Sequence, residues 1–164
     1  MLSKNTLLYL LLALGGVWIM TISRNVKAKS AWKISRRGVQ YQELFKSVET
    51  KYGIPKNMLA RMAQQESGFD TTIVSPRGAE GLMQIVPMWH PGVNPFNPPE
   101  AIDYAGKFLK QMRDKFGSWS LALAAYNWGP GNLQKNPNPA TWPKETRNYV
   151  AQIGEDVDSG ARWA

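Results

Sequence analysis

The chain has 164 residues, of which 43% are hydrophobic and 20% charged, and its formal net charge is +8. This balance excludes a disordered polyelectrolyte and a multi-pass membrane protein, and the length predicts one domain with its own core. Because cysteine is absent, disulfides, thiol catalysis and zinc sites built on thiolates are excluded.

The excess positive charge lies in the first 40 residues, which contain no acidic side chain. From Tyr41 onward, basic and acidic residues nearly balance. This distribution disfavours a nucleic-acid-binding domain, so no nucleic-acid partner is expected. DNA binding by the basic segment Arg24–Arg37 is the alternative, and it predicts an affinity that falls steeply with salt.

Residues 5–23 form an uncharged run, in which residues 7–22 read LLYLLLALGGVWIMTI. As a helix this run would be about 28 Å long, close to the roughly 30 Å hydrocarbon core of a bilayer. We therefore predict a single-pass transmembrane anchor over residues 1–23 and a basic juxtamembrane linker over residues 24–38. A cleaved signal peptide is the alternative.

The orientation of this anchor follows from the charges beside it. Six basic residues come after the run: Arg24, Lys27, Lys29, Lys33, Arg36 and Arg37. The positive-inside rule therefore places the following domain on the cytoplasmic side. This orientation conflicts with the function inferred below, and the sequence leaves the conflict open.

The remaining residues, 39–164, are expected to form one globular all-α domain of five or six helices, because no alternating strand pattern is present. Helical periodicity is found over residues 38–52, 55–67, 99–116 and 119–127, and again from 143 onward. Glycines at 53, 68 and 117 are natural helix ends, and Ser118 is a candidate N-cap. Gly129-Pro130-Gly131 is expected to break the fourth helix.

Glu66 is unusual within the second predicted helix. It follows Ala63, Met62 and Leu59 by three, four and seven residues, so its carboxyl extends the apolar face of the helix. It also lies in the last turn, where the helix dipole disfavours negative charge. Both effects raise the pKa of a carboxyl, as a general acid near neutral pH requires. A solvated glutamate at a helix end is the alternative interpretation.

Aromatic residues that could stack on sugar rings surround this position in the sequence. They are Phe69, Trp89, Tyr126, Trp128 and Trp142. Burial in the core is the alternative for each of them. The sole histidine, His90, lies in a Pro-rich loop without a partner for metal binding, so we predict neither a metal nor a cofactor.

Four short motifs follow one another along the chain. Residues 66–70 read ESGFD, residues 75–84 SPRGAEGLMQ, residues 125–131 AYNWGPG and residues 145–150 ETRNYV. In order and spacing, these motifs resemble the signatures of the soluble lytic transglycosylase family, over about residues 40–155. Val86 departs from the Met that is common in the family, at a position where a substrate contact is expected.

The resemblance implies a goose-type lysozyme-like fold that cleaves the β-1,4 bond between MurNAc and GlcNAc in peptidoglycan. Glu66 would be the single catalytic acid, which protonates the glycosidic oxygen and then accepts the proton of the MurNAc C6 hydroxyl as a 1,6-anhydro ring closes. Tyr126 would hold Glu66 in position. The resemblance assigns substrate binding to Ser75, Gln84, Tyr126, Asn127 and Glu145.

A glycosidase that uses water needs a second carboxylate, about 5–9.5 Å from the acid. Asp70 and Glu80 are the acids nearest to Glu66 in the sequence, and both are expected to be solvated loop charges. Attack by the C6 hydroxyl of the substrate itself requires no such partner.

The sequence thus predicts a membrane-anchored peptidoglycan lytic transglycosylase that opens the cell wall locally, either for a phage genome or for an envelope machine. A lysozyme-type hydrolase of the same fold and a non-catalytic peptidoglycan-binding assembly protein are the alternatives. The expected partners are glycan strands, the lipid bilayer around residues 5–23, and proteins of a virion or envelope complex. The expected location is a virion membrane or the bacterial inner membrane, with the catalytic domain reaching the periplasm or cell wall.

Overall fold

The structure is a computed structural model that describes residues 11–13, 16–18, 33–158 and 162–163. The chain divides into two units, residues 1–30 and 31–164, and each is described by itself. In the first unit, β1 (Leu11–Ala13) and β2 (Gly16–Trp18) pair antiparallel. These strands fall within the run predicted as a transmembrane helix, and the rest of that run lies outside the described residues. Among the residues described, no helix is both long and apolar enough to cross a membrane, so the predicted anchor helix is not confirmed.

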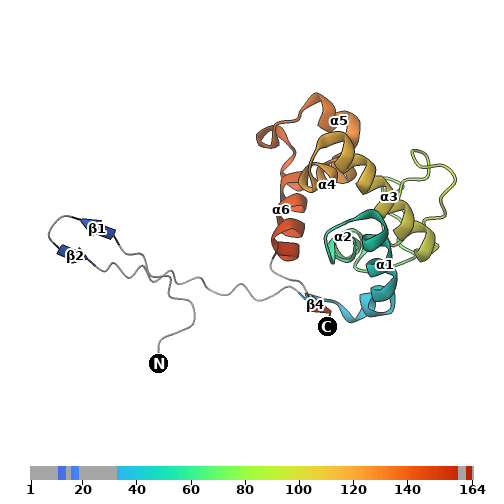
Figure 1. Cartoon of the computed structure of the whole chain (residues 1–164). Coiled ribbons are helices and arrows are strands. Elements are labelled where there is room, and N and C mark those ends of the chain that lie inside the picture. The colour runs from blue at the N-terminus through green and yellow to red at the C-terminus, as the bar shows by residue number, and fades with distance from the viewer. Residues whose placement is uncertain (1–10, 14–15, 19–32, 159–161, 164) are drawn as a thin grey trace. The chain divides into compact units, whose positions relative to one another are not determined.

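The second unit is mainly helical in its described part, which confirms the predicted all-α class (Figure 1). Its helices are η1 (Arg36–Tyr41), α1 (Gln42–Tyr52), α2 (Met58–Ser67), α3 (Pro98–Phe116), α4 (Trp119–Trp128), α5 (Pro130–Lys135), η2 (Pro139–Thr141) and α6 (Lys144–Asp158). Two short strands, β3 (Lys33–Ile34) and β4 (Arg162–Trp163), pair in parallel. The helices α1, α2 and α3 each end at the predicted glycine, and the Ser118 hydroxyl accepts a hydrogen bond from the Leu121 N–H as the expected N-cap.

The segment that follows α4 differs from the prediction. Gly129 does end α4, but the Gly-Pro-Gly sequence does not lead into a loop, because Pro130 begins the short helix α5. Proline is well suited to the first turn of a helix, since the N–H that it lacks has no helical partner there.

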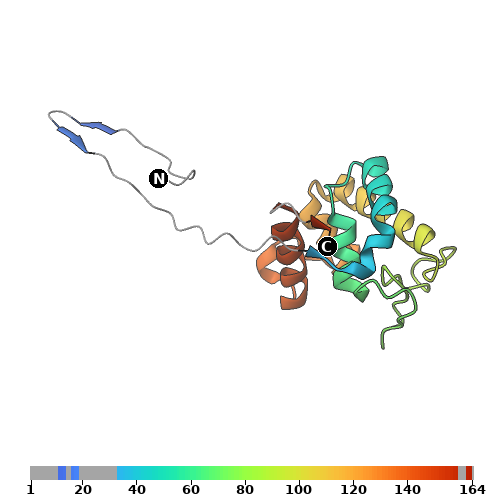
Figure 2. The ribbon, with the colours of Figure 1, turned by 90° about the horizontal axis from the view of Figure 1, so that it is seen from below.

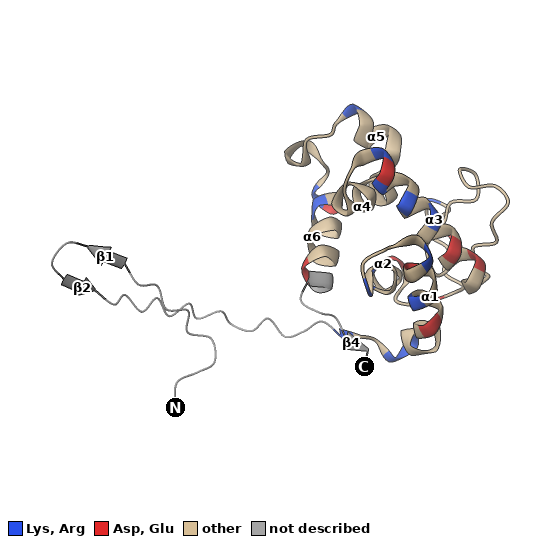
Figure 3. Ribbon diagram, in the orientation of Figure 1, with Lys and Arg blue, Asp and Glu red and all other residues tan. Residues whose placement is uncertain are grey.

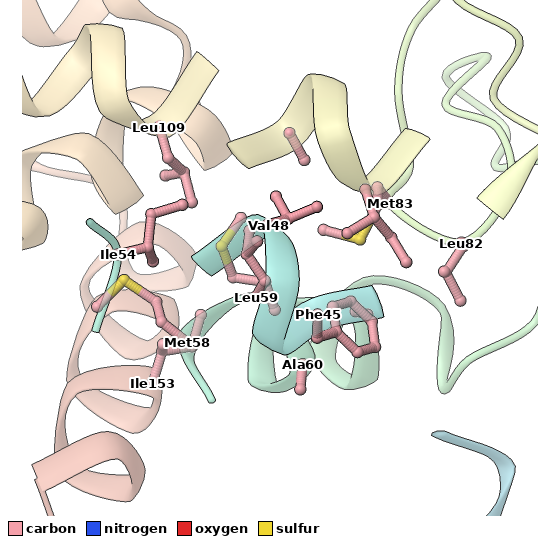
Figure 4. Packing of buried hydrophobic residues seen from close by; sticks show 14 of the residues in the cluster. Phe45, Val48, Ile54, Met58, Leu59, Ala60, Leu82, Met83, Leu109 and Ile153 are labelled. Carbon is pink, nitrogen blue, oxygen red and sulfur yellow. The ribbon is translucent and has the colours of Figure 1, made fainter. Parts of the chain in front are cut away.

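The core is built around α2, which contacts α1, α3 and α6 and lies in the middle of the domain (Figure 1, Figure 2). Figure 4 shows Phe45 and Val48 of α1, Leu59 of α2, Leu109 of α3 and Ile153 of α6 packed together. All five side chains are buried. Helix packing on several sides fixes α2, and therefore fixes the last turn that carries Glu66.

Residues 33–38, which the sequence prediction assigns to the linker, pack into the domain. Ile34 is fully buried. The Ser35 N–H donates to the Gln64 Oε1 at 3.1 Å. Gly38 lies so close to the Phe69 ring that a Cβ on it would meet the ring at 2.6 Å. The chain thus enters the domain against the C-terminal end of α2.

A buried carboxylate caps the N-terminal end of α2. Glu49 of α1 is only 5% exposed. Its Oε2 accepts the Asn57 N–H at 2.8 Å, and its Oε1 accepts the Leu59 N–H at 2.9 Å. Burial raises the pKa of Glu49 to about 7, although these hydrogen bonds act in the opposite direction. Glu49 thereby satisfies helix-terminal N–H groups that water cannot reach.

The loop between α2 and α3 contains a small antiparallel β element that the sequence pattern did not predict. Glu80 and Ile85 exchange backbone hydrogen bonds of 2.9 and 3.0 Å, and Val74 bridges to Glu80 on its other side. The Gly81 N–H donates to the Ile73 carbonyl at 2.8 Å. These bonds close residues 73–85 into a compact loop.

Gly81 is expected to be irreplaceable in this loop. Its backbone is left-handed (φ 67°), and a Cβ would stand 2.0 Å from the Pro95 carbonyl oxygen. The Gly81→Ala variant should lose about 3 kcal/mol of unfolding free energy in urea denaturation. Gly78→Ala is the matched control, because its φ is 77° but nothing lies within 4 Å of the added Cβ, so it should lose only about 1 kcal/mol. Equal losses in the two variants would contradict the steric argument.

Candidate active site

The centre of the candidate site is a hydrogen bond between two distant helices. The Tyr149 hydroxyl of α6 donates to the Glu66 Oε1 of α2 at 2.7 Å. Tyr149 is buried and Glu66 is partly buried. The core packing of α2 and α6 therefore positions the carboxyl that the sequence singles out.

This carboxyl opens into a cleft of about 280 Å³. The side chains that line the cleft come from α2, α4 and α6: Gln65, Glu66, Asn127, Glu145, Asn148, Tyr149 and Gln152. The lining consists mainly of amides with two carboxylates, which is suited to binding the hydroxyl and N-acetyl groups of a polar ligand.

The Glu66 carboxyl is held in a protonatable state by its surroundings. Burial is the main cause that raises the pKa of Glu66 to about 7; the hydrogen bond from Tyr149 opposes the increase, and the negative charge of Glu145 adds to it. This confirms the direction expected from the position of Glu66 on the apolar face of its helix. A carboxyl with a pKa near 7 can both donate and accept a proton at neutral pH.

The hydroxyl that is hydrogen-bonded to Glu66 in the structure is that of Tyr149, and the Tyr126 hydroxyl is bonded elsewhere. The Tyr126 hydroxyl donates to the Met83 carbonyl at 2.7 Å, so it attaches the loop to α4. Tyr149 is on the inward face of the last predicted helix, four residues after Glu145, a spacing that places both residues on one side of the helix. The sequence contained that signal, but it could not show that the helix lies opposite Glu66.

Asn127 and Glu145, two of the residues expected to bind substrate, both line the cleft, with Asn127 on α4 and the exposed Glu145 on α6. The Thr146 hydroxyl donates to the Asn127 Oδ1 at 2.8 Å. This bond fixes the amide orientation, and it leaves the amide nitrogen of Asn127 to donate to a ligand.

Ser75 and Gln84 stabilise the loop in the structure and are not among the residues that line the cleft. The Ser75 Oγ accepts the Ala79 N–H at 2.9 Å, and the Gln84 Nε2 donates to the Gly81 carbonyl at 3.0 Å. Gln84 also has a positive φ of 48°, a conformation that the neighbouring bonds maintain.

The remaining acids of this region are local loop groups. The Asp70 carboxylate accepts both the N–H and the hydroxyl of Thr72 at 2.8 Å, which lowers its pKa. Over the described residues, no group of three or more His, Asp and Glu side chains is arranged to hold a metal ion.

Replacing Tyr149 by Phe should shift the pH dependence of catalysis. The hydrogen bond from Tyr149 stabilises the ionised form of Glu66, so its removal should raise the pKa of Glu66. Because Glu66 must be protonated to act as an acid, the decline of activity at high pH should move to higher pH, with about a tenfold lower maximum rate. Tyr126→Phe should leave the position of this decline unchanged. A shift in Tyr126→Phe without a shift in Tyr149→Phe would show instead that Tyr126 positions Glu66.

The described residues thus combine a helical fold with a partly buried carboxyl of raised pKa that faces an amide-lined cleft, an arrangement suited to general acid catalysis. Residues 43–148 match the Transglycosylase SLT domain family, and the chain belongs to this family.

Individual relatives agree with this assignment. The chain is 25% identical over 123 residues to a transglycosylase of Enterobacteria phage PRD1, covering 73% of this chain and 44% of the phage protein. It is 30% identical over 143 residues to the membrane-bound lytic murein transglycosylase F of Cellvibrio japonicus, covering 76% and 29%. Its fold is similar to that of the 70 kDa soluble lytic transglycosylase of Escherichia coli, with a TM-score of 0.61, 28% identity, and 73% and 24% coverage. The chain therefore spans less than half the length of these proteins.

Proposed function

We propose that the chain is a peptidoglycan lytic transglycosylase, which cleaves the β-1,4 bond between MurNAc and GlcNAc and forms 1,6-anhydroMurNAc. The observation that carries this proposal is the Glu66 carboxyl, held by Tyr149 at 2.7 Å in the cleft with a pKa of about 7. Membership in the Transglycosylase SLT domain family supports the same reaction class.

The reaction requires one group that gives a proton and takes one back. Glu66 donates its proton to the glycosidic oxygen as the bond from that oxygen to the MurNAc C1 breaks. The carboxylate then accepts the proton of the MurNAc C6 hydroxyl while the C6 oxygen bonds to C1. Glu66 ends protonated, no water is consumed, and the products are one anhydro sugar and one free GlcNAc end. A pKa near 7 serves both steps.

We propose substrate-binding roles for the residues that the sequence singled out beside Glu66. Asn127 and Glu145 contact the substrate from the cleft walls, and Tyr126 contacts it beside the loop. Ser75 and Gln84 contribute by shaping the loop and by contacting N-acetyl and peptide-bearing groups.

A lysozyme-type hydrolase remains the second candidate, because Glu145 lines the same cleft as Glu66. In an inverting hydrolase, a second carboxylate activates water on the opposite face of the sugar. The two candidates differ in what they require of Glu145. The transglycosylase needs Glu145 only for binding, whereas the hydrolase needs it for the attack on C1.

The deciding experiment is digestion of purified peptidoglycan by the wild-type chain and by Glu145→Gln, with mass analysis of the muropeptides. We expect anhydro products, which lack one water relative to hydrolysis products, and a loss of rate in Glu145→Gln that stays below about a hundredfold. Reducing-end MurNAc together with an inactive Glu145→Gln would instead establish the hydrolase. Binding to peptidoglycan without any cleavage by the wild-type chain would establish the non-catalytic assembly protein.

We further propose that residues 1–23 anchor the enzyme in a virion membrane or the bacterial inner membrane, that residues 24–38 connect the anchor to the domain and pack against it from residue 33 onward, and that residues 39–164 act on the wall. The uncharged run of residues 5–23 and the phage and membrane-bound relatives support this arrangement. Proteins of a virion or envelope complex are the proposed partners. Protease treatment of intact membranes or virions tests it, and a domain protected on the cytoplasmic side would contradict it.

A further inference from the structure

The segment before α3, residues 86–97, exposes apolar side chains to solvent. Met88 is 73% and Trp89 is 71% exposed. The segment contains no Lys, Arg, Asp or Glu, and Figure 3 shows it in tan where it projects beside α3. Other aromatic candidates from the sequence differ, since Phe69 and Trp142 are buried in the core. An indole so exposed offers its faces to a ligand.

Packed aromatic rings hold the base of this segment. The residue after Trp89, His90, lies 5.5 Å from Phe108 and 5.4 Å from Tyr104, measured between ring centroids, in edge-to-face geometry. The His90 Nδ1 is also hydrogen-bonded to the Tyr104 hydroxyl at 2.6 Å. These contacts anchor the segment on α3 and leave the Trp89 side chain outside the packed rings.

The same row of rings continues to the candidate active site. The Phe108 ring lies 5.7 Å from the Tyr126 ring, again edge to face. Burial raises the pKa of Tyr126, and the negative charge of Glu66 raises it further, so Tyr126 and Glu66 are electrostatic neighbours. Two ring contacts thus connect Tyr126, which is an electrostatic neighbour of Glu66, to the base of the exposed segment.

The chemistry of this surface is suited to a neutral sugar. The face of an aromatic ring is electronegative, and the axial C–H bonds of a pyranose ring present a weakly positive, apolar face. An uncharged segment neither attracts nor repels the carbohydrate backbone. Because a glycan strand is a long polymer, it extends beyond the cleft on both sides of the bond at Glu66.

We propose that Trp89 is an outer sugar-binding residue, which stacks on a pyranose ring of the glycan strand at a distance from the bond that is cleaved. The row from His90 through Phe108 to Tyr126 positions the segment relative to the cleft. The choice of a glycan as the ligand rests on the proposed function. Trp89 would then set a preference for long strands and would not take part in the reaction itself.

The test is calorimetric binding of β-1,4-linked N-acetylglucosamine oligomers of increasing length to the full chain in detergent, in a Glu66→Gln background that prevents cleavage. Adding Trp89→Ala should weaken binding of the longest oligomers about tenfold and leave the shortest unaffected. Trp89→Phe should retain most of the affinity, because it keeps an aromatic face. Met88→Ala is the matched control and should bind like its parent.

Equal affinities of Trp89→Ala and its parent at every length would overturn the proposal. So would equal losses in Met88→Ala and Trp89→Ala together with reduced binding of both to anionic phospholipid vesicles, since that pattern describes a lipid contact. The proposed reaction is tested separately by wild-type digestion of peptidoglycan. If Trp89→Ala weakens binding of long oligomers but the wild-type chain cleaves no peptidoglycan, the sugar site is supported and the proposed reaction is wrong. If the wild-type chain cleaves peptidoglycan but Trp89→Ala binds all oligomers like its parent, the proposed reaction is supported and the sugar site is wrong.

Discussion

Replacing Glu66 by Gln should abolish peptidoglycan cleavage, lowering the rate by about 10²–10⁴-fold. The amide has nearly the same shape and can still accept the hydrogen bond from Tyr149, but it carries no acidic proton for the glycosidic oxygen. The measurement is the release of soluble muropeptides from purified sacculi. Binding to sacculi should persist, because the cleft retains its shape.

The same variant should be more stable than the wild-type chain at high pH. The pKa of Glu66 is raised from 4.5 to about 7 in the folded state, so the folded chain binds its proton more tightly than the unfolded chain does. Its contribution to stability is therefore complete below pH 4.5 and is lost as the pH rises through 7. At pH 8, where the wild-type carboxyl is ionised in a poorly solvated site, Glu66→Gln should gain about 2 kcal/mol in urea denaturation.

The control for both measurements is Glu80→Gln, the same chemical change in the loop. It should retain wild-type activity within about twofold and show no gain in stability at pH 8. Cleavage by Glu66→Gln at the wild-type rate would show that another group supplies the proton.

Replacing Glu49 by Ala should cost the domain about 4 kcal/mol of unfolding free energy at pH 5. The Asn57 and Leu59 N–H groups would remain buried without an acceptor, and each such group costs about 1–3 kcal/mol. Urea denaturation is the measurement. The loss should also reduce activity at temperatures near the unfolding transition, because Glu49 caps the helix that carries Glu66.

This cost should depend on pH in a defined direction. The pKa of Glu49 is raised to about 7 in the folded state, so its contribution to stability declines as the pH rises from 4.5 through 7. The difference between the wild-type chain and Glu49→Ala should therefore shrink by about 2 kcal/mol between pH 5 and pH 8. Glu43→Ala is the control on the same helix, since its ion pair with Lys46 is exposed and should contribute at most about 0.5 kcal/mol. A cost in Glu49→Ala no larger than in Glu43→Ala would contradict the capping role.

Much of the fold could be predicted because the signals are local. The periodicity of apolar residues gives the helices, and the Gly and Ser residues at their ends give the boundaries, as at Gly68 and Ser118. The β element at Glu80 and Ile85 could not be predicted, because its few backbone bonds leave no alternating pattern. The helix that follows Gly129 was missed for a related reason, since six residues are too few to show a period.

For the candidate site too, local features could be predicted from the sequence and contacts between distant residues could not. The unusual position of Glu66 follows from its spacing to the apolar residues of one helix, so its raised pKa could be anticipated. Its hydrogen bond to Tyr149 joins residues 83 positions apart, and only the packing of α2 on α6 brings them together. The cleft-lining amides Gln65, Asn148 and Gln152 were missed for the same reason, because their side chains are ordinary on an exposed helical face.

The attachment of the N-terminal segment has a mechanical consequence. Ser35 is hydrogen-bonded to Gln64, and Gly38 packs closely against Phe69. Gln64 and Phe69, the two residues that hold the N-terminal segment, therefore flank Glu66 along the chain. A pulling force applied through the residues before Lys33 therefore enters the domain beside the turn that carries Glu66. Recording glycan cleavage while the chain is stretched from its N-terminus would measure how far this tension slows the reaction.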